Sequence, residues 1–152
     1  MLIDTVLNAK GRDVFTISPD AGVANAAQAM HRQRVGVLVV TGKAGEILGV
    51  ISERDVIGAL GANGAKAMRL TVSDLMTRSV ITCRSSDTAE DVMRLMVRNR
   101  IRHVPVVDDG LVGVVSARDL LAENLHQQTV TVQSLLSLNR CRPRTPSYAF
   151  GG

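Results

Sequence analysis

Apolar residues recur with two different periods along this chain, and each change of period marks a new element. In segments 23–30 and 89–96 they fall at i, i+3, i+4 and i+7, the spacing of a helix with one buried face. Four other segments are short, largely apolar runs that are typical of buried strands: 36–40, 47–51, 103–107 and 111–115. The pattern therefore predicts a mixed α+β fold.

The same order of elements occurs twice. Residues 14–40 align with residues 80–106 without a gap. Identical residues at matched places include Thr16 and Thr82, Met30 and Met96, and Arg34 and Arg100. In each copy the second strand of the hairpin leads into a further helix, so the unit is strand, helix, strand, strand, helix. We expect two such units, residues 1–64 and 65–138.

The two units should depend on each other for stability. A unit of about 60 residues buries little surface, so we expect the halves to pack face to face. The connecting segment 61–78 contains a short helical turn at 71–76. We expect Asp87 to cap the following helix, with Glu90 as its partner. We expect residues 139–152 to form a basic, disordered tail.

One motif occurs at matched places in both units. Residues 49–55 read Gly-Val-Ile-Ser-Glu-Arg-Asp, and residues 113–119 read Gly-Val-Val-Ser-Ala-Arg-Asp. A serine followed three residues later by an acid is a good helix start, and a single copy would be explained by capping alone. A mid-strand glycine, however, often marks close approach by a ligand or by backbone. A helix N-terminus also attracts phosphate, and an aspartate can accept the hydrogen bonds of a ribose diol.

The duplicated motif, the repeated unit and the segment Arg-Ile-Arg-His-Val-Pro-Val at 100–106 together resemble a tandem pair of CBS domains. The resemblance covers about residues 5–125. It implies a disc with two clefts that bind adenosine ligands such as AMP, ADP, ATP, S-adenosylmethionine or NAD. It also implies a non-catalytic regulatory module, an energy or redox sensor that forms a homodimer and acts on a downstream protein.

The same resemblance implies roles for particular residues. Ribose would be held by Asp55 and Asp119, and phosphate would lie near Ser52 and Ser116. Main chain near Thr16–Ile17 and Thr82–Cys83 would contact adenine. Arg102 and His103 would reach phosphate from the opposite unit, and Arg100 would add positive charge nearby. The remaining candidate site residues are Arg54, Arg118, Val104 and Pro105. Because Gly36 and Val37 replace that Arg–His pair in the first unit, we expect the two clefts to bind unequally.

Charge and composition narrow the alternatives. The chain has 18 lysines and arginines, of which three lie in the tail, which leaves 15 against 14 acidic residues in the body. With 2% aromatic residues, a stacking surface for nucleic acid is not expected, although an Arg-rich tail could still serve a protein or nucleic-acid interaction module. We expect no catalysis, because His103 lacks an accompanying nucleophile or acid motif. A fragment of an enzyme that contains CBS domains is the third possibility.

The two cysteines and the lack of a long apolar run are relevant to the cellular location of the protein. Cys83 and Cys141 lie far apart and form no metal-binding motif, so no metal site is expected. No apolar run reaches the roughly 18 residues that a membrane span needs. We therefore expect a cytoplasmic protein.

Overall fold

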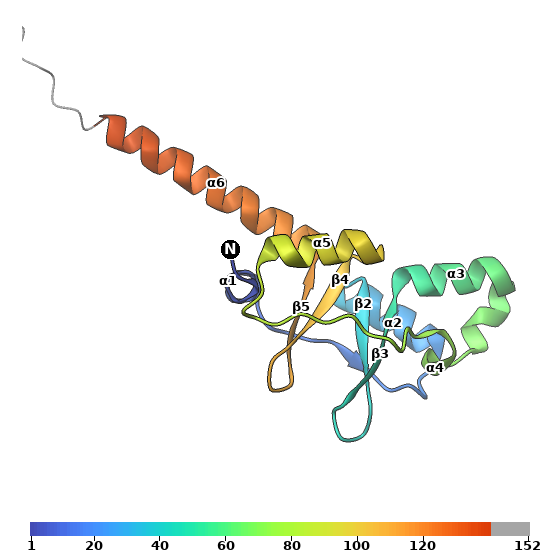
Figure 1. The fold of residues 1–152 in the computed structure, drawn as a ribbon. Helices are drawn as coiled ribbons and strands as arrows, with labels where there is room; N and C mark the ends of the chain where they lie inside the picture. Colours follow the sequence, from blue (N-terminus) through green and yellow to red (C-terminus); the bar gives the residue numbers. More distant parts are fainter. Residues whose placement is uncertain (141–152) are drawn as a thin grey trace, which may run out of the picture.

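The computed structural model describes residues 1–140, except for the side chains of residues 138–140. The first half comprises α1 (Ile3–Lys10), β1 (Thr16–Ile17), α2 (Val23–Gln33), β2 (Val37–Thr41), β3 (Ile47–Ser52) and α3 (Glu53–Asn63). The second half comprises a 3-10 helix (Gly64–Arg69), α4 (Val72–Leu75), α5 (Ala89–Asn99), β4 (His103–Val107), β5 (Leu111–Ser116) and α6 (Ala117–Arg140). The elements form a body from which α6 extends (Figure 1).

Each half is built on an antiparallel hairpin, β2–β3 in the first and β4–β5 in the second. β1 adds to β2 in parallel, with Ile17 opposite Val40. In the second half a single parallel bridge between Cys83 and Val106 takes the corresponding place. The predicted α+β fold with two repeated units is therefore confirmed, although the first strand of the second unit is reduced to one bridge.

The hydrophobic cores show that the two halves exchange their leading segments. The first core joins α2, β2, β3 and α3 to Val72 and Met76, which belong to the linker. The second joins α5, β4, β5 and the start of α6 to Ile3 and Leu7 of α1. Figure 1 shows α1 beside the second hairpin and α4 beside α2. The boundary expected at residue 64 thus separates the sequence repeats, whereas each packed unit takes a segment from both sides of it.

Backbone hydrogen bonds fix this exchange in the same way on both sides. The amide of Val23 donates to the Leu70 carbonyl at 2.9 Å, and the amide of Ala89 donates to the Met1 carbonyl at 2.9 Å. Each bond ties the start of a repeat's first helix to the segment that precedes the other repeat. The halves therefore share backbone structure as well as packed side chains.

Residues close in sequence determine where most of the helices begin. Ser52 caps α3, and its partner Asp55 completes a capping box. α5 begins one residue later than expected, because Thr88 is its cap and accepts from the amide of Asp91. Asp87 instead accepts a hydrogen bond from the amide of Arg84 at 2.8 Å and so stabilises the preceding turn. The expectation that Asp87 caps this helix was wrong.

α6 is longer than the pattern predicted. It continues to Arg140, so the first two residues of the expected tail are helical. Residues 141–152, which carry most of the Arg-rich segment, lie outside the described part of the chain. Among residues 1–140, no helix combines the length and the apolar character that crossing a lipid bilayer requires.

Candidate functional site

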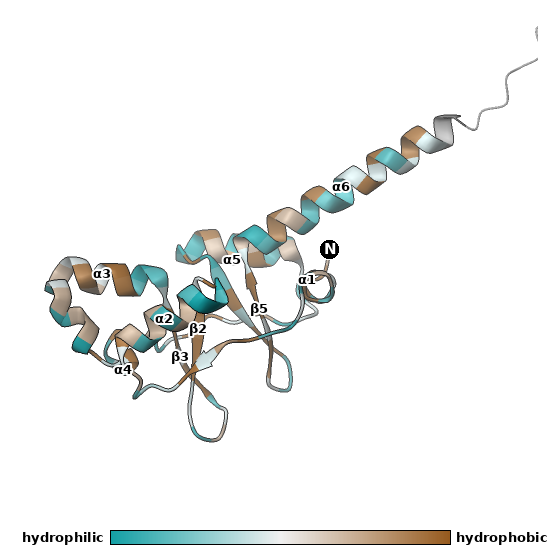
Figure 2. Cartoon of the chain, turned by 180° about the vertical axis from the view of Figure 1, so that it is seen from behind, coloured by the Kyte–Doolittle hydropathy of each residue, from teal (hydrophilic) through white to brown (hydrophobic). Residues whose placement is uncertain are grey.

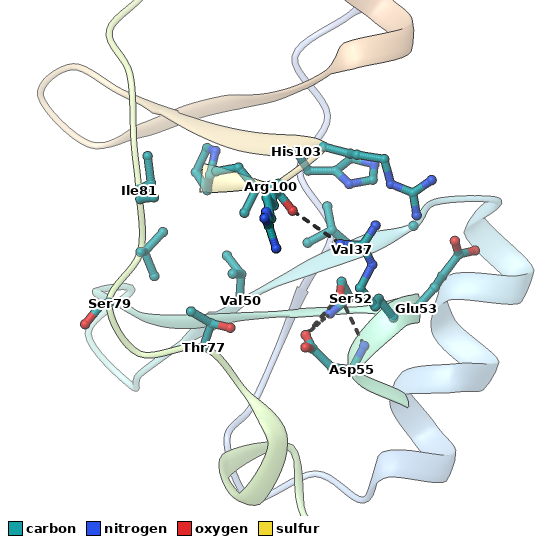
Figure 3. Close-up of a pocket in the computed structure, with 16 residues that line it drawn as sticks. Val37, Val50, Ser52, Glu53, Asp55, Thr77, Ser79, Ile81, Arg100 and His103 are labelled. Atoms are coloured by element: carbon teal, nitrogen blue, oxygen red, sulfur yellow. Dashed lines mark hydrogen bonds between the residues drawn. The ribbon is translucent and has the colours of Figure 1, made fainter. Parts of the chain in front are cut away.

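Two clefts lie between the repeats and are lined by equivalent residues. The first, here the Asp55 cleft, has a volume of about 250 Å³. It lies between the start of α3, the linker residues before Thr82 and the start of β4 (Figure 3). The second, here the Asp119 cleft, has a volume of about 700 Å³ and lies at the start of α6. The duplicated motif therefore places one serine–aspartate pair in each cleft.

The serine and aspartate of each pair bond to each other. In the Asp55 cleft, Asp55 Oδ2 accepts from the Ser52 amide at 2.8 Å and from Ser52 Oγ at 3.0 Å, while Ser52 Oγ accepts from the Asp55 amide. In the Asp119 cleft, Asp119 Oδ2 accepts from the Ser116 amide at 2.8 Å. The capping role is thus real in both repeats. Within residues 1–140, Oδ1 of either aspartate accepts no hydrogen bond, which leaves one carboxylate oxygen for a ligand.

Cations converge on the Asp55 cleft from both repeats. Arg54 Nη1 donates to the carbonyl oxygen of Arg100 at 3.2 Å and so spans the boundary between them (Figure 3). Arg100 and its counterpart Arg34 both have left-handed backbone conformations, with φ of 55°. Each ends a helix and lines a cleft, Arg100 the Asp55 cleft and Arg34 the Asp119 cleft. Arg100, whose charge was expected near the phosphate, lies in this cleft, whereas no sequence signal marks its left-handed backbone.

Arg102 and His103 lie where the two clefts meet. Both residues line both clefts, and Glu53 does so as well. A Cβ atom at Gly36 would lie 3.0 Å from His103 Cε1 and 3.2 Å from Glu53 Oε2, so the glycine makes room for these side chains. The expected reach of Arg102 and His103 into the Asp55 cleft agrees with this placement. Their position on the Asp119 cleft as well was not foreseen.

The electrostatics of this junction favour a neutral imidazole. Burial lowers the pKa of His103, and the neighbouring Arg102 charge lowers it further, while Asp119 and Glu53 act in the opposite direction. His103 can therefore act as a hydrogen-bonding group at neutral pH, while Arg102 supplies the positive charge.

Five candidate residues lie outside both clefts. Cys83 and Val104 are buried in the second core, and burial raises the Cys83 pKa to about 12. Thr82, Thr16 and Ile17 do not line either cleft. The walls are formed instead by residues just before them, Ser79, Val80 and Ile81 in one cleft and Asp13 and Phe15 in the other. Phe15 and Ile81 match in the repeat alignment, and Asp13 and Ser79 directly precede its two segments, which is the signal that could have identified them.

The mid-strand glycines serve packing. A Cβ atom at Gly49 would lie 2.8 Å from the carbonyl oxygen of Thr77, and one at Gly113 would lie 2.6 Å from Leu7 Cδ2. Thr77 and Leu7 belong to the exchanged segments. Of the two uses expected for such a glycine, close approach by protein is the one that the structure shows.

Comparison with known proteins identifies the fold. The profile of the CBS domain matches residues 10–62 and 72–126. CBSX3, a mitochondrial CBS domain-containing protein of Arabidopsis thaliana, is 33% identical over 143 residues, which cover 88% of this chain and 69% of that protein. A crystal structure of a CBS-domain containing protein from Agrobacterium tumefaciens has 35% identity and a TM-score of 0.80, covering 82% of this chain and 99% of that one.

A further solved structure contains ligands. The CBS domain pair of protein MJ0100, crystallised with 5′-methylthioadenosine and S-adenosyl-L-methionine, has 26% identity and a TM-score of 0.75 over 84% of this chain and 98% of that one. Some relatives are longer: the chain spans 57% of a Methanopyrus kandleri protein at 32% identity and 23% of a Methanocaldococcus jannaschii inosine-5′-monophosphate dehydrogenase at 30% identity. With both repeats matched, this chain belongs to the CBS-domain family and carries a tandem pair of CBS domains.

Proposed function

We propose that this CBS pair is a non-catalytic regulatory module that binds an adenosine nucleotide in the Asp55 cleft. One observation carries the proposal: the cleft combines a carboxylate oxygen free to accept hydrogen bonds, an apolar wall and a group of cations. Each of these suits one part of a nucleotide. MJ0100, which has the same fold, binds two adenosine compounds.

The arrangement of the cleft suggests how a nucleotide would lie in it. Figure 3 shows Ile81 on one side of the cleft, Ser52 and Asp55 on the other, and Val50 between them. The two aliphatic side chains offer flat apolar surface for a purine ring. Asp55 Oδ1 can accept from a ribose hydroxyl, since the capping bonds use only Oδ2.

The charged end favours a ligand that carries phosphate. Arg54, Arg100 and Arg102 all line the Asp55 cleft, and among the described residues that line it the acidic ones are Glu53 and Asp55. A phosphate that loses water on binding needs such partners. We therefore place AMP, ADP, ATP or NAD ahead of S-adenosylmethionine, which has no phosphate, and we assign the module to energy or redox sensing. The output would be a ligand-dependent change in binding to another protein.

Isothermal titration calorimetry with an Asp55→Ala variant tests the proposal. We expect the variant to lose about 1.5–3 kcal/mol of AMP binding free energy, the usual range for hydrogen bonds to a charged group. The substitution also removes half of a capping box, so a capping control is needed. Asp91→Ala provides it, because Asp91 occupies the same position of the 11-residue α5 and lies outside both clefts.

Both variants should lose stability, Asp55→Ala the more because Asp55 also accepts from the amide of its cap residue, but only Asp55→Ala should lose AMP binding. If Asp55→Ala and Asp91→Ala lose AMP affinity equally, the serine–aspartate motif serves only as a helix cap. A thermal-shift panel gives an independent readout. At about a hundred times its dissociation constant, a true ligand adds roughly 2.7 kcal/mol of stability. If AMP, ATP, NAD and S-adenosylmethionine all leave the melting temperature unchanged at millimolar concentration, the proposed function is wrong.

A further inference from the structure

The distal part of α6 has no packing partner within the described chain. Residues 124–137 are all exposed, whereas α6 meets α1, α5 and β5 near its start. Figure 1 shows the helix leaving the body, and Figure 2 shows apolar positions recurring along it. Residues 127–140 also lie beyond both matched CBS domains. This part of the helix therefore lies outside the two matched CBS domains.

The composition of this segment does not favour an isolated helix. Four consecutive β-branched residues occupy positions 129–132, and such residues lose side-chain freedom in a helix. Side-chain pairing along the exposed turns is limited to the bond from Gln128 Nε2 to Asn124 Oδ1 at 2.9 Å. Helices of this length are marginal in water even with better sequences. A packing partner would supply the missing stability.

The exposed apolar residues form one stripe. At 100° per residue, five of them fall within about 100° around the axis. We call this set the α6 stripe: Leu121, Leu125, Val132, Leu135 and Leu136, each more than half exposed. Leu120, which is buried in the second core, lies about 120° from the centre of the stripe. The α6 stripe therefore faces away from the body and is accessible to another molecule.

The lack of charge identifies the kind of partner. Residues 124–137 contain no aspartate, glutamate, lysine or arginine. Anionic membranes and nucleic acids attract basic residues, which this segment does not offer. Positions 121, 125, 128, 132 and 135 alternate in steps of four and three, the repeat of a two-stranded coiled coil, with Gln128 as its single polar member. An uncharged stripe with this repeat matches another copy of itself without like-charge repulsion.

We propose that the α6 stripe docks against the α6 stripe of a second copy of this chain. The stripe runs over residues 121 to 136, which span about 24 Å of helix, and a helix presents a face about 10 Å wide. The two faces together cover roughly 480 Å², which is less than the about 1,200 Å² at which standard stable interfaces begin. The dimer should therefore be reversible, with a dissociation constant in the micromolar range. The inference is independent of the proposed nucleotide site.

Sedimentation equilibrium of the full chain tests this interface over protein concentrations from about 1 to about 500 µM. The wild-type chain should show a monomer–dimer equilibrium, and Val132→Glu should raise the dissociation constant at least about tenfold by placing charge in the stripe. Val130→Glu is the matched control. Val130 is 47% exposed and Val132 55% exposed, yet they lie about 160° apart around the same helix. The control should dimerise like the wild type, and circular dichroism should show the same fold in both variants.

Two kinds of result would overturn the proposal. The first is a chain that stays monomeric throughout the concentration range. Equal effects of the two substitutions, or a dimer that Val132→Glu leaves intact, would place the interface elsewhere. Sedimentation with neutral phosphatidylcholine vesicles is the last arm. If the wild-type chain binds these vesicles and Val132→Glu does not, the stripe meets a membrane and not a second copy.

Discussion

At the scale of single residues, Arg34 and Arg100 adopt a backbone conformation that costs free energy. The left-handed region disfavours a residue with a Cβ by about 1 kcal/mol, and glycine usually takes this place after a helix. Both repeats nevertheless keep arginine there, at φ of 55°. Each arginine lines a cleft next to a serine–aspartate pair. A strained conformation at matched places next to both clefts is typical of functional positions.

We therefore expect Arg100→Gly to raise the stability of the fold and to weaken AMP binding. Loss of the strain should raise the free energy of unfolding by up to about 1 kcal/mol, reduced somewhat by the greater freedom of glycine in the unfolded chain. Loss of the charge should weaken AMP binding in the Asp55 cleft by roughly 0.5–1 kcal/mol, the usual range for an exposed charge. Urea denaturation and calorimetry measure the two effects.

Arg34→Gly is the control for this prediction. It should relieve the same strain while leaving the Asp55 cleft intact, because Arg34 lines the other cleft. A gain in stability from Arg100→Gly with unchanged AMP affinity would mean that the arginine makes no contribution to binding.

Local rules explain which site residues could be predicted. Ser52 and Asp55 are three residues apart, so their geometry follows from the helix start that they form. The proposed adenine wall depends instead on where the chain passes the other repeat. The resemblance implied a wall at Thr82–Cys83, whereas Ser79–Ile81 line the cleft. Cys83 points into the core because it extends the sheet beside Val106. Sequence periodicity carries no information about such a crossing.

At the scale of elements, the exchange of leading segments explains the two mid-strand glycines. α1 packs on the second hairpin, and the linker through α4 packs on the first. The repeat alignment began at residue 14, so it contained no counterpart for α1 and could not predict its placement. The close approach at Gly49 involves the backbone of Thr77, whereas that at Gly113 involves only the side chain of Leu7. This difference matters, because a side chain can move more readily than backbone.

We expect three glycine-to-alanine substitutions to differ in sign and size. Gly49→Ala should destabilise the fold by about 2–3 kcal/mol, since the new methyl group meets a fixed carbonyl. Gly113→Ala should cost about 1 kcal/mol, because Leu7 can partly adjust. Gly58→Ala should stabilise by roughly 0.5–1 kcal/mol, because a Cβ there meets nothing within 4 Å and lies inside α3. Chemical denaturation measures all three, and equal costs at Gly49 and Gly113 would contradict the packing argument.

At the scale of the whole molecule, the two clefts are unequal and share their charged centre. The second repeat supplies Arg102 and His103, and the matched residues of the first repeat are Gly36 and Val37. Arg102 and His103 line both clefts, so one pair of side chains borders both. From the missing pair we expected the two clefts to bind unequally, and this stays a prediction. The sequence could not predict the sharing, which arises from the packing of one repeat against the other.

Because Arg102 lines both clefts, we predict that two phosphate-bearing ligands compete for it, whereas two uncharged ligands do not. We expect the ratio of the second to the first dissociation constant to be at least about fivefold larger for AMP than for adenosine, within the usual range of coupling between sites. The reason is that Arg102 can neutralise only one phosphate at a time, so the second phosphate enters a cleft whose cation is engaged. The comparison with adenosine cancels the difference in shape between the two clefts.

The Arg102→Ala variant isolates the contribution of this side chain. In Arg102→Ala, AMP should bind more weakly than in the wild type, adenosine should bind as before, and the excess ratio should fall below about twofold. High salt should act in the same direction, because it screens the Coulomb part of the coupling. Calorimetric titrations of both ligands against both proteins give the four ratios, and a wild-type chain that binds two AMP molecules as evenly as two adenosine molecules would contradict a shared phosphate partner.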